Sequence, residues 1–406
     1  MRRTAVLVVL AVGIFELTDA ADSLNCRLVG SHHLDYGNCV ATSKQFAYVS
    51  SSYRSLYILD VSDPAAPFEL GKLDAIEYLE CVTLWNGLVC LGGDTAYGGF
   101  LWIIDVSDPR NPHKIGDYSF PWGVRIEGDI AVSGDYAYVP AGRDGLRILR
   151  MKPQSPYELG HWDGLGKTGG AVLSGNLAYV TDKDSGLQIL DVSDPRTPYE
   201  LGRCSLPGST DGIAVSGEFA YVAGVDVGGK LRVIDVSDPQ EPHQTGWAGF
   251  PGTAQGVAVT GELAHVVSRQ GLYVIDVSDS QSPRLVGWYV NVSGYGGLVV
   301  SEGLAYTPGL DIIEFLGEGV EETPNDGVRA ANTMPTVARG VLCLSAAPGH
   351  ELQATSLLDI SGRKVLDLHA GANDVLALAP GVYFLKEGGE RSEEGGVGIR
   401  KVVITR

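Results

Sequence analysis

The chain consists of short apolar runs separated by Gly, Pro, Ser, Asn and Asp residues. The stretch 201–239 shows the pattern, since Gly-Ile-Ala-Val, Phe-Ala-Tyr-Val-Ala and Leu-Arg-Val-Ile-Asp-Val alternate there with turn-forming residues. Runs this short, rich in β-branched and aromatic residues, predict strands rather than helices. We name the expected strands a (212–215), b (219–223), c (231–236) and d, which begins the Leu-Gly segment of the next unit. Apolar residues on both faces of a strand indicate a sheet packed between two others.

This unit recurs along the chain and is marked by the pentapeptide Asp-Val-Ser-Asp-Pro. The pentapeptide stands at 60–64, 105–109, 191–195 and 235–239, with a near copy at 276–280. Arg150 and Glu314 occupy two degenerate copies, which gives seven markers spaced 38 to 45 residues apart. An all-strand unit of that period predicts an all-β, seven-bladed β-propeller, because each blade buries its faces only against its neighbours.

The connections between strands are of two kinds. Pairs such as Ser216-Gly217 join a to b and the pentapeptide joins c to d, whereas the d-to-a and b-to-c loops vary. In an up-and-down blade the two regular turns share one face and the two variable loops share the other, where we expect specificity. The array begins with a d-type segment, Leu28-Val29-Gly30, and ends with a c-type run at 310–315. We therefore expect the N-terminal strand to complete the last blade and close the ring.

The runs at 57–61, 102–106 and 232–236 resemble the LVIVD repeat of bacterial surface propellers. The resemblance covers residues 27–316, implies a secreted or surface-exposed propeller and implies no catalytic residues. Arg150-Met151-Lys152 replaces the acidic turn of the third unit, so we expect a different corner in that blade.

The two ends of the chain carry features of export. Residues 1–21 join two arginines to a short apolar run and small residues, which predicts a secretory signal peptide; no later run is long enough to span a membrane. Residues 317–331 are polar and acidic and read as a linker, and the short strand-like runs of 332–406 predict a small Ig-like β-sandwich.

The motifs at 358–365, 380–384 and 400–404 are similar to the type IX secretion sorting domain. That resemblance implies passage across the outer membrane, the type IX secretion machinery as a partner, and a secreted or cell-surface location. The alternative is an accessory sandwich with no sorting role.

Charge and cysteine content narrow the range of partners. The net charge of -19 opposes nucleic acid, whose recognition depends on Lys and Arg. The six cysteines have no zinc-site spacing, and we expect no metal and no cofactor; an oxidised pair cannot be assigned. The run 164–169 contains Gly-Lys-Thr but precedes an expected strand rather than a helix, and 182–186 starts like a calcium loop but lacks the later acidic ligand.

The candidate binding residues precede strand a and should surround the mouth of the central channel. They are Asn38, Glu80, Trp122, Thr168, Asp211, Gln255 and Tyr295. The b-to-c loops add Arg54, Asp94, Tyr97, Arg143, Asp144, Asp226 and Arg269. Mixed polar and aromatic side chains suit an extracellular glycan or protein, so we expect a binding or adhesion module rather than an enzyme.

Two alternatives stay open. Glu80 and Asp211 are carboxylates that a polysaccharide hydrolase or lyase could use. An envelope scaffold is the second alternative, and it predicts a mouth filled by side chains.

Overall fold

The computed structural model describes residues 23–317 except 35, 76, 165, 227, 291 and 293–295, and beyond them only the strands between 336 and 404. The predicted signal peptide (1–21) lies outside the described residues, as does all but the first residue of the predicted linker (317–331). The chain divides into two compact units, of which the first ends at Leu316 and the second begins at Gly317.

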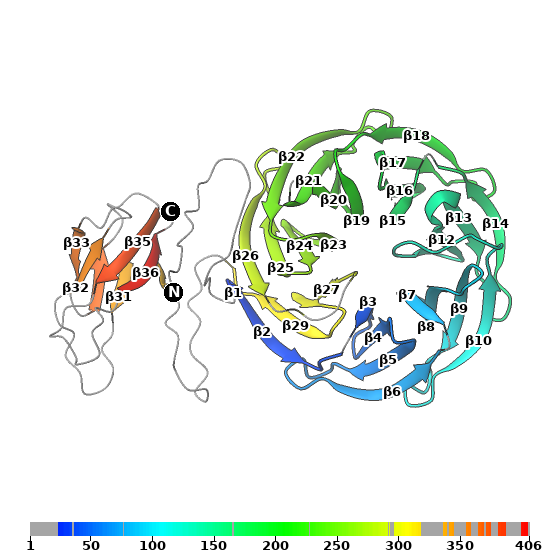
Figure 1. Ribbon diagram of the computed structural model, residues 1–406, viewed down its shortest axis with the longest axis horizontal. Helices are drawn as coiled ribbons and strands as arrows, with labels where there is room; N and C mark the ends of the chain where they lie inside the picture. Colours follow the sequence, from blue (N-terminus) through cyan, green and yellow to red (C-terminus); the bar gives the residue numbers. More distant parts are fainter. Residues whose placement is uncertain are drawn as a thin grey trace, which may run out of the picture. The chain divides into compact units, whose positions relative to one another are not determined.

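The first unit is a seven-bladed β-propeller, as the repeat predicts. Seven antiparallel sheets surround a central channel, each with its strands in the order a, b, c, d from the centre outward (Figure 1). Six of the sheets have four strands and one has five.

The first four blades follow the chain without interruption. Blade 1 contains β3 (Gly37–Thr42), β4 (Phe46–Ser51), β5 (Ser55–Asp60) and β6 (Phe68–Asp74). Blade 2 contains β7 (Tyr78–Trp85), β8 (Leu88–Asp94), β9 (Gly99–Asp105) and β10 (His113–Ser119). Blade 3 contains β11 (Ala131–Ser133), β12 (Tyr136–Pro140), the 3₁₀ turn η1 (Gly142–Asp144), β13 (Leu146–Arg150) and β14 (Tyr157–Trp162). Blade 4 contains β15 (Thr168–Ser174), β16 (Leu177–Asp182), β17 (Gly186–Asp191) and β18 (Tyr199–Cys204).

The last three blades include the N-terminal strands. Blade 5 contains β19 (Ser209–Ser216), β20 (Phe219–Asp226), β21 (Gly228–Asp235) and β22 (His243–Phe250). Blade 6 contains β23 (Ala254–Thr260), β24 (Leu263–Ser268), β25 (Gly271–Asp276) and β26 (Arg284–Val290), with β1 (Ser23–Leu24) as its fifth strand. Blade 7 contains β27 (Val299–Ser301), β28 (Leu304–Tyr306), β29 (Asp311–Phe315) and the N-terminal β2 (Cys26–Ser31).

The N-terminal strand closes the ring, which confirms the predicted closure. β2 pairs antiparallel with β29, with Arg27 opposite Glu314 and Ser31 opposite Asp311 (Figure 1). Arg27 forms an ion pair with Glu314, and the Ser31 hydroxyl donates a hydrogen bond to Asp311 Oδ1 over 2.8 Å. The last described c strand therefore has no free edge, as a closed propeller requires.

The pentapeptide turn is built from two successive Asp-capped turns. Asp191 Oδ1 accepts the Ser193 backbone N–H at 2.8 Å, and Asp194 Oδ1 accepts the Arg196 N–H at 3.1 Å. Hydrogen bonds from the Ser193 hydroxyl and backbone N–H hold the pKa of Asp191 below its usual value. The same pair of turns recurs in blades 1, 2, 5 and 6. In blade 3 Arg150 instead pairs with Asp135 at 2.7 Å, so this corner differs as expected.

A glycine in strand d receives this turn from the next blade. A Cβ added to Gly202 would lie 2.4 Å from the Pro239 carbonyl oxygen, so only glycine allows the two chains to approach. The equivalent approaches, at 2.1 to 2.4 Å, join Gly30 to Pro64, Gly71 to Pro109, Gly116 to Pro153, Gly160 to Pro195 and Gly246 to Ser280. The Leu-Gly segment and the pentapeptide are therefore two halves of one contact between blades.

Apolar side chains of strands b and c fill the space between blades. Tyr occupies the third position of strand b in five blades, at Tyr48, Tyr138, Tyr179, Tyr221 and Tyr306, all of which are buried. Blade 6 places His265 there, where its Nδ1 atom is buried without a hydrogen-bond partner. Burial lowers the pKa of His265 to about 4.

The second unit contains strands where the apolar runs predict them. A five-stranded sheet has the order β30 (Thr336–Ala338), β36 (Ile399–Ile404), β35 (Gly381–Lys386), β32 (Thr355–Leu358), β33 (Lys364–Leu368). β31 (Val341–Leu344) pairs with β34 (Gly371–Asp374). The Ig-like sandwich stays a prediction. Within the described residues, no helix has the length and apolar character that crossing a membrane requires.

We expect Gly246→Ala to lower the free energy of unfolding by about 2 kcal/mol, because the added methyl group would overlap the Ser280 carbonyl oxygen. Gly249→Ala is the matched control in the same strand, since its Cβ would meet nothing closer than 3.6 Å; we expect a change below about 0.5 kcal/mol. Urea unfolding of both variants measures the difference. Equal losses would mean that the approach between blades does not limit packing.

We expect His265→Tyr to reduce the acid sensitivity of the fold. The pKa of His265 is about 4 in the folded chain and 6.5 in a model peptide, so the unfolded chain binds the proton first. Stability is therefore lost as pH falls from about 6.5 towards 4, by about 2 kcal/mol at pH 4.5. Tyrosine, which neighbouring blades accommodate here, lacks this loss. Urea unfolding of both proteins at pH 7 and pH 4.5 checks it, and an unchanged stability difference between the two pH values contradicts it.

Candidate functional site

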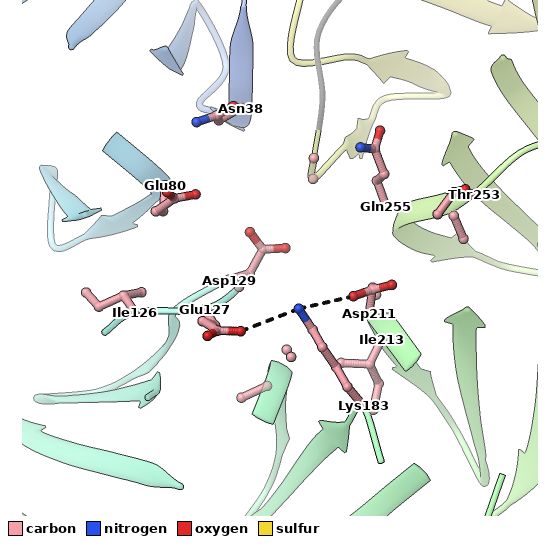
Figure 2. Close-up of a pocket in the computed structure, with 18 of the residues that line it drawn as sticks. Asn38, Glu80, Ile126, Glu127, Asp129, Lys183, Asp211, Ile213, Thr253 and Gln255 are labelled. Carbon is pink, nitrogen blue, oxygen red and sulfur yellow. Dashed lines mark hydrogen bonds and ion pairs between the residues drawn. The ribbon is translucent and has the colours of Figure 1, made fainter. Parts of the chain in front are cut away.

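An open cavity of about 570 Å³ lies where the d-to-a and b-to-c loops surround the channel (Figure 2). Its described lining is polar: five carboxylates (Glu80, Asp94, Glu127, Asp129 and Asp211) and three cationic side chains (Arg125, Lys183 and Arg269), with glycines between them. No aromatic side chain lines it among the residues that the structure describes.

The seven blades contribute one equivalent position each to the rim of this cavity. The position lies eight residues before the first residue of strand b. It is occupied by Asn38, Glu80, Gly128, Gly169, Asp211, Gln255 and Gly296, and all seven line the cavity. The three glycines leave the rim open beside blades 3, 4 and 7. At this position the rim therefore carries four side chains, from four different blades.

Four of the sequence-predicted residues lie at the cavity, and two of the other three, Thr168 and Trp122, do not. Asn38, Glu80, Asp211 and Gln255 line it. The expectation that Thr168 faces the mouth is wrong: its side chain is fully buried, and its hydroxyl lies 3.0 Å from the Gly142 carbonyl and 3.1 Å from that of Gly145. Trp122 does not line the cavity and is 85% exposed on the loop after β10. Tyr295 lies outside the described residues.

The b-to-c loops contribute two of their seven candidates. Asp94 and Arg269 line the cavity. Arg54 instead stacks 4.9 Å above the Tyr78 ring, Tyr97 projects into solvent, and Arg143 and Asp144 belong to the turn η1. Asp226 ends β20, and its side chain is outside the described part.

Lys183 forms ion pairs with two carboxylates of the cavity lining. Its Nζ lies 3.5 Å from Glu127 Oε2 and 3.5 Å from Asp211 Oδ1, so it bridges blades 3 and 5 from blade 4 (Figure 2). Lys167 adds a second cation at 2.8 Å from Glu127. The turn that aims Lys183 is fixed by buried Asp182, whose Oδ1 accepts the Asp184 and Ser185 backbone N–H groups at 2.9 and 2.8 Å. The calcium-like run is thus an Asp-capped turn that presents a lysine.

The carboxyl groups of Glu80 and Asp94 hold their protons more tightly than free carboxyl groups do. Burial raises the pKa of Glu80, and the negative charges of Asp94 and Glu127 raise it further, whereas Arg125 and Lys183 oppose them. Burial also raises the pKa of Asp94. The hydrogen bond from the Ile126 backbone N–H at 3.1 Å and the charge of Arg125 at 3.5 Å lower it in part. A raised carboxyl pKa suits proton donation or the binding of a hydrogen-bond donor.

Asp129 reaches across the channel from blade 3. It accepts a hydrogen bond of 3.2 Å from the Cys39 thiol of blade 1, and its carboxylate borders Gly297 of blade 7. Although Asp129 keeps accessible surface inside the channel, the enclosing blades raise its pKa. One carboxyl group of the cavity lining is therefore enclosed by residues of blades 1, 3 and 7.

One acceptor group on the rim remains available to a ligand. Glu80 makes no hydrogen bond or ion pair to a described residue, whereas Gln255 Oε1, which also has no partner, is buried. The two residues lie on opposite sides of the cavity in Figure 2. Asn38 is fixed, since it donates to the Leu79 carbonyl at 2.7 Å and accepts from the Ser52 hydroxyl at 2.8 Å. The free carboxyl group of Glu80 favours a ligand that donates hydrogen bonds.

The sequence-based search missed Arg125, Glu127, Asp129 and Lys183. The first three belong to a segment of blade 3 in which charged residues alternate with Ile126 or Gly128, directly before the short strand β11. Counting back eight residues from strand b would have placed the rim at Gly128 and directed attention to its charged neighbours. Lys183 carries no local signal beyond its place in a b-to-c loop.

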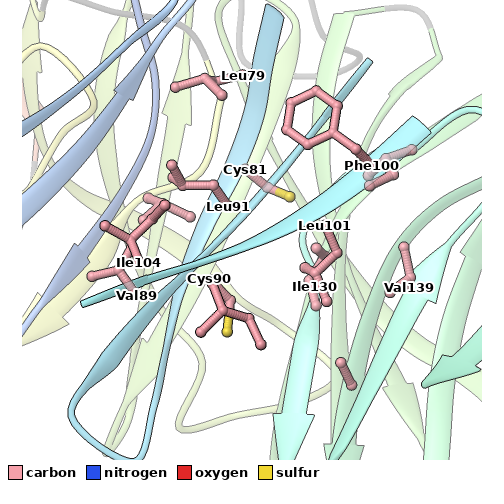
Figure 3. Close-up of a cluster of buried hydrophobic side chains, with 14 of the residues drawn as sticks. Leu79, Cys81, Val89, Cys90, Leu91, Phe100, Leu101, Ile104, Ile130 and Val139 are labelled. Carbon is pink, nitrogen blue, oxygen red and sulfur yellow. The ribbon is translucent and has the colours of Figure 1, made fainter. Parts of the chain in front are cut away.

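The five cysteines of the propeller are buried and none of them is in a disulfide: Cys26, Cys39, Cys81, Cys90 and Cys204. Cys81 and Cys90 lie in blade 2 among Leu91, Leu101 and Ile130, facing blade 3 (Figure 3). Burial raises the pKa of Cys90 to about 12, so the thiol stays protonated. No cluster of three or more His, Cys, Asp or Glu side chains is placed to bind a metal in the part of the chain that the structure describes. The Gly-Lys-Thr run leads into strand β15, without the helix that a phosphate loop needs.

We expect opposite substitutions around Lys183 to move the pKa of Glu80 in opposite directions. Lys183→Met removes a cation and should raise the pKa of Glu80, whereas Glu127→Gln removes an anion and should lower it. Carboxyl ¹³C NMR titration measures both, with Glu80→Gln to assign the resonance. Arg203→Met is the control, because Arg203 pairs with Glu200 in strand d. Shifts of the same sign would contradict this network.

Comparison with known proteins agrees with the repeat and the fold. The LVIVD repeat family model matches residues 37–75, 93–119, 125–149, 165–205, 207–246 and 251–291, which is about half of the chain. No curated protein sequence matches significantly. The crystal structure of RRP9 WD40 repeats is similar over 69% of this chain and 88% of that one, at 12% identity and a TM-score of 0.54.

A second solved structure, of U3-55K, covers 69% of this chain and 90% of its own at 12% identity and a TM-score of 0.55. A chain of the mitotic checkpoint complex covers 76% of this chain and 100% of its own, again at 12% identity and a TM-score of 0.55. At this identity the likeness shows the fold alone. The repeat matches and the seven-bladed ring together establish that the chain belongs to the LVIVD repeat family.

Proposed function

We propose that this chain is a secreted or cell-surface binding module that takes an extracellular glycan or protein segment in the cavity on its variable face. One observation carries the proposal: a repeated scaffold surrounds an open cavity of about 570 Å³ whose rim residues differ from blade to blade. The repeated strands and turns build the frame, and the residues that differ between blades lie at the mouth of the cavity. That division is typical of propellers that bind ligands on one face.

The free acceptor at Glu80 supports a ligand rich in hydroxyl or amine donors. An open cavity weighs against the envelope scaffold, for which side chains should fill the mouth. Export through the type IX secretion route is proposed from the terminal motifs at 358–365, 380–384 and 400–404.

A polysaccharide hydrolase or lyase is the second candidate, and the raised pKa of Glu80 favours it as a general acid. Its partner carboxylate, Asp211, is engaged by Lys183 at 3.5 Å and lies across the cavity from Glu80 (Figure 2). A carboxylate held by a lysine is a poor nucleophile. Binding without turnover therefore accounts better for the geometry.

The proposal is tested on the native protein recovered from the medium, cell surface and periplasm. We expect an intact mass lacking residues 1 to about 21, in the surface or medium fraction. That species is then screened for retention by envelope glycans and peptides. Thr253→Trp should weaken retention more than about tenfold, because Thr253 lines the mouth and the indole would cover it.

Thr197→Trp is the matched control on the opposite face, since Thr197 follows the blade 4 pentapeptide and is exposed. A chain confined to the periplasm would overturn the export route. Retention untouched by Thr253→Trp would overturn the cavity as the site. Release of shortened saccharides, lost in Glu80→Gln, would favour the enzyme.

A further inference from the structure

Five exposed aromatic side chains gather on the variable face of blades 1, 2 and 3, and we name them the aromatic arc. Tyr36, Tyr53, Tyr78, Tyr97 and Trp122 are 48%, 63%, 54%, 74% and 85% exposed. Each stands on a d-to-a or b-to-c loop or, for Tyr78, at the first residue of strand a. The described loops of blades 4 to 7 contribute no exposed large hydrophobic side chain to this face. The arc is thus confined to one side of the rim.

Three of the five rings contact a neighbouring side chain, and a backbone hydrogen bond joins the loops that carry the other two. Tyr36 and Tyr53 meet edge to face with centroids 4.4 Å apart, and Arg54 lies 4.9 Å above the Tyr78 ring. Tyr36 and Arg54 adopt left-handed backbone conformations, with φ of 61° and 67°, which side chains rarely adopt without compensation. The Tyr97 carbonyl accepts the Gly123 N–H at 2.9 Å, which ties the loops of blades 2 and 3. Rings fixed beforehand lose little entropy on binding.

The composition of the arc distinguishes among partners. All its large hydrophobic residues are aromatic, and Leu28, the one exposed large aliphatic residue among the described ones, lies on the outer strand β2. Protein interfaces are enriched in Met as well as in aromatic residues, and the arc contains no Met. Proline-rich peptides dock in aromatic-lined grooves, but none of these five rings lines the cavity and each projects into solvent. Flat projecting rings suit a ligand with apolar faces and polar edges.

The charge of the chain narrows the ligand further. A net charge of -19 repels polyanions such as uronic-acid polymers. Arg54, which contacts the arc, is already stacked on the Tyr78 ring. An uncharged polymer meets no such repulsion.

We propose that the aromatic arc binds a neutral polysaccharide chain by stacking sugar rings on Tyr53, Tyr97 and Trp122. The proposal rests on the same general function, a binding module that acts through its variable face, but it places the glycan on the arc and not in the central cavity. The cavity then serves a separate ligand or the end of the same chain.

The test uses the full mature chain on immobilised neutral gluco-, manno-, galacto-, xylo- and N-acetylglucosamine oligosaccharides, beside uronic-acid oligosaccharides and a proline-rich peptide. Wild type should bind at least one neutral oligosaccharide. Tyr97→Ala and Trp122→Ala should each weaken that binding about tenfold, and together abolish it. Both side chains are so exposed that their removal should leave the thermal unfolding midpoint unchanged.

Matched controls are exposed aromatic residues elsewhere on the propeller. Tyr199→Ala lies beside the blade 4 pentapeptide turn, and Trp247→Ala lies on the outer strand β22, with exposures of 54% and 48%. Neither should alter binding. Thr253→Trp separates the two sites: loss of binding there with none in the arc variants overturns the arc and leaves the cavity. Loss of binding in the arc variants with none in Thr253→Trp supports the arc.

Three further outcomes overturn the proposal. They are binding to no neutral oligosaccharide, preference for uronic-acid oligosaccharides, and binding of the proline-rich peptide that the arc variants abolish. The last result would assign the arc to a peptide.

Discussion

The close approach of a strand d glycine to the turn of the next blade is the contact on which the propeller depends. It requires glycine on one side, as at Gly202, and a rigid turn on the other, which two successive Asp-capped turns provide at Asp235 and Asp238. Because six of the seven interfaces between blades contain this contact, its geometry sets the spacing around most of the ring. The last blade has no such turn; there Gly287 packs against Phe315 and Leu24, so β1 and β2 complete the circle.

This constraint acts at the periphery and leaves the inner rim free. The repeated residues lie in strands b and c and in the c-to-d turns, far along each blade from the variable loops. The rim position is Asn38, Glu80 or Asp211 in some blades. In others it is glycine, because a Cβ on Gly128, for example, would lie 1.5 Å from the Gly169 carbonyl oxygen of the next blade. The cavity and the aromatic arc both occur on this variable face. The architecture thus separates what holds the ring together from what a ligand would meet.

The same division explains how far the sequence could be read. Periodicity predicted the blades, the closure by the N-terminal strand and the odd corner at Arg150, because each follows from local pattern and one repeated contact. The strands extend beyond the apolar runs, as β19 (Ser209–Ser216) does, because ladders continue through polar residues at the mouth. Rim residues were found where the loop length matched, as at Asp211, and missed where it did not, as at Thr168. Contacts at the cavity, such as Lys183 with Glu127, join residues that are far apart in the sequence. The spacing of residues along the chain therefore does not predict them.

Blade 3 makes the site asymmetric, and asymmetry is what recognition needs. Seven equal blades would offer a rotationally symmetric mouth, in which an asymmetric ligand has no preferred orientation. In blade 3 strand a shrinks to Ala131–Ser133, and Gly128, at φ 106° with Gly169 O where its Cβ would stand, lets the preceding segment turn inward. The residues on either side of Gly128 then make their contacts: Glu127 with Lys183, and Asp129 with Cys39. Blade 3, which departs from the repeat in strand a and in its c-to-d corner, therefore orients the cavity.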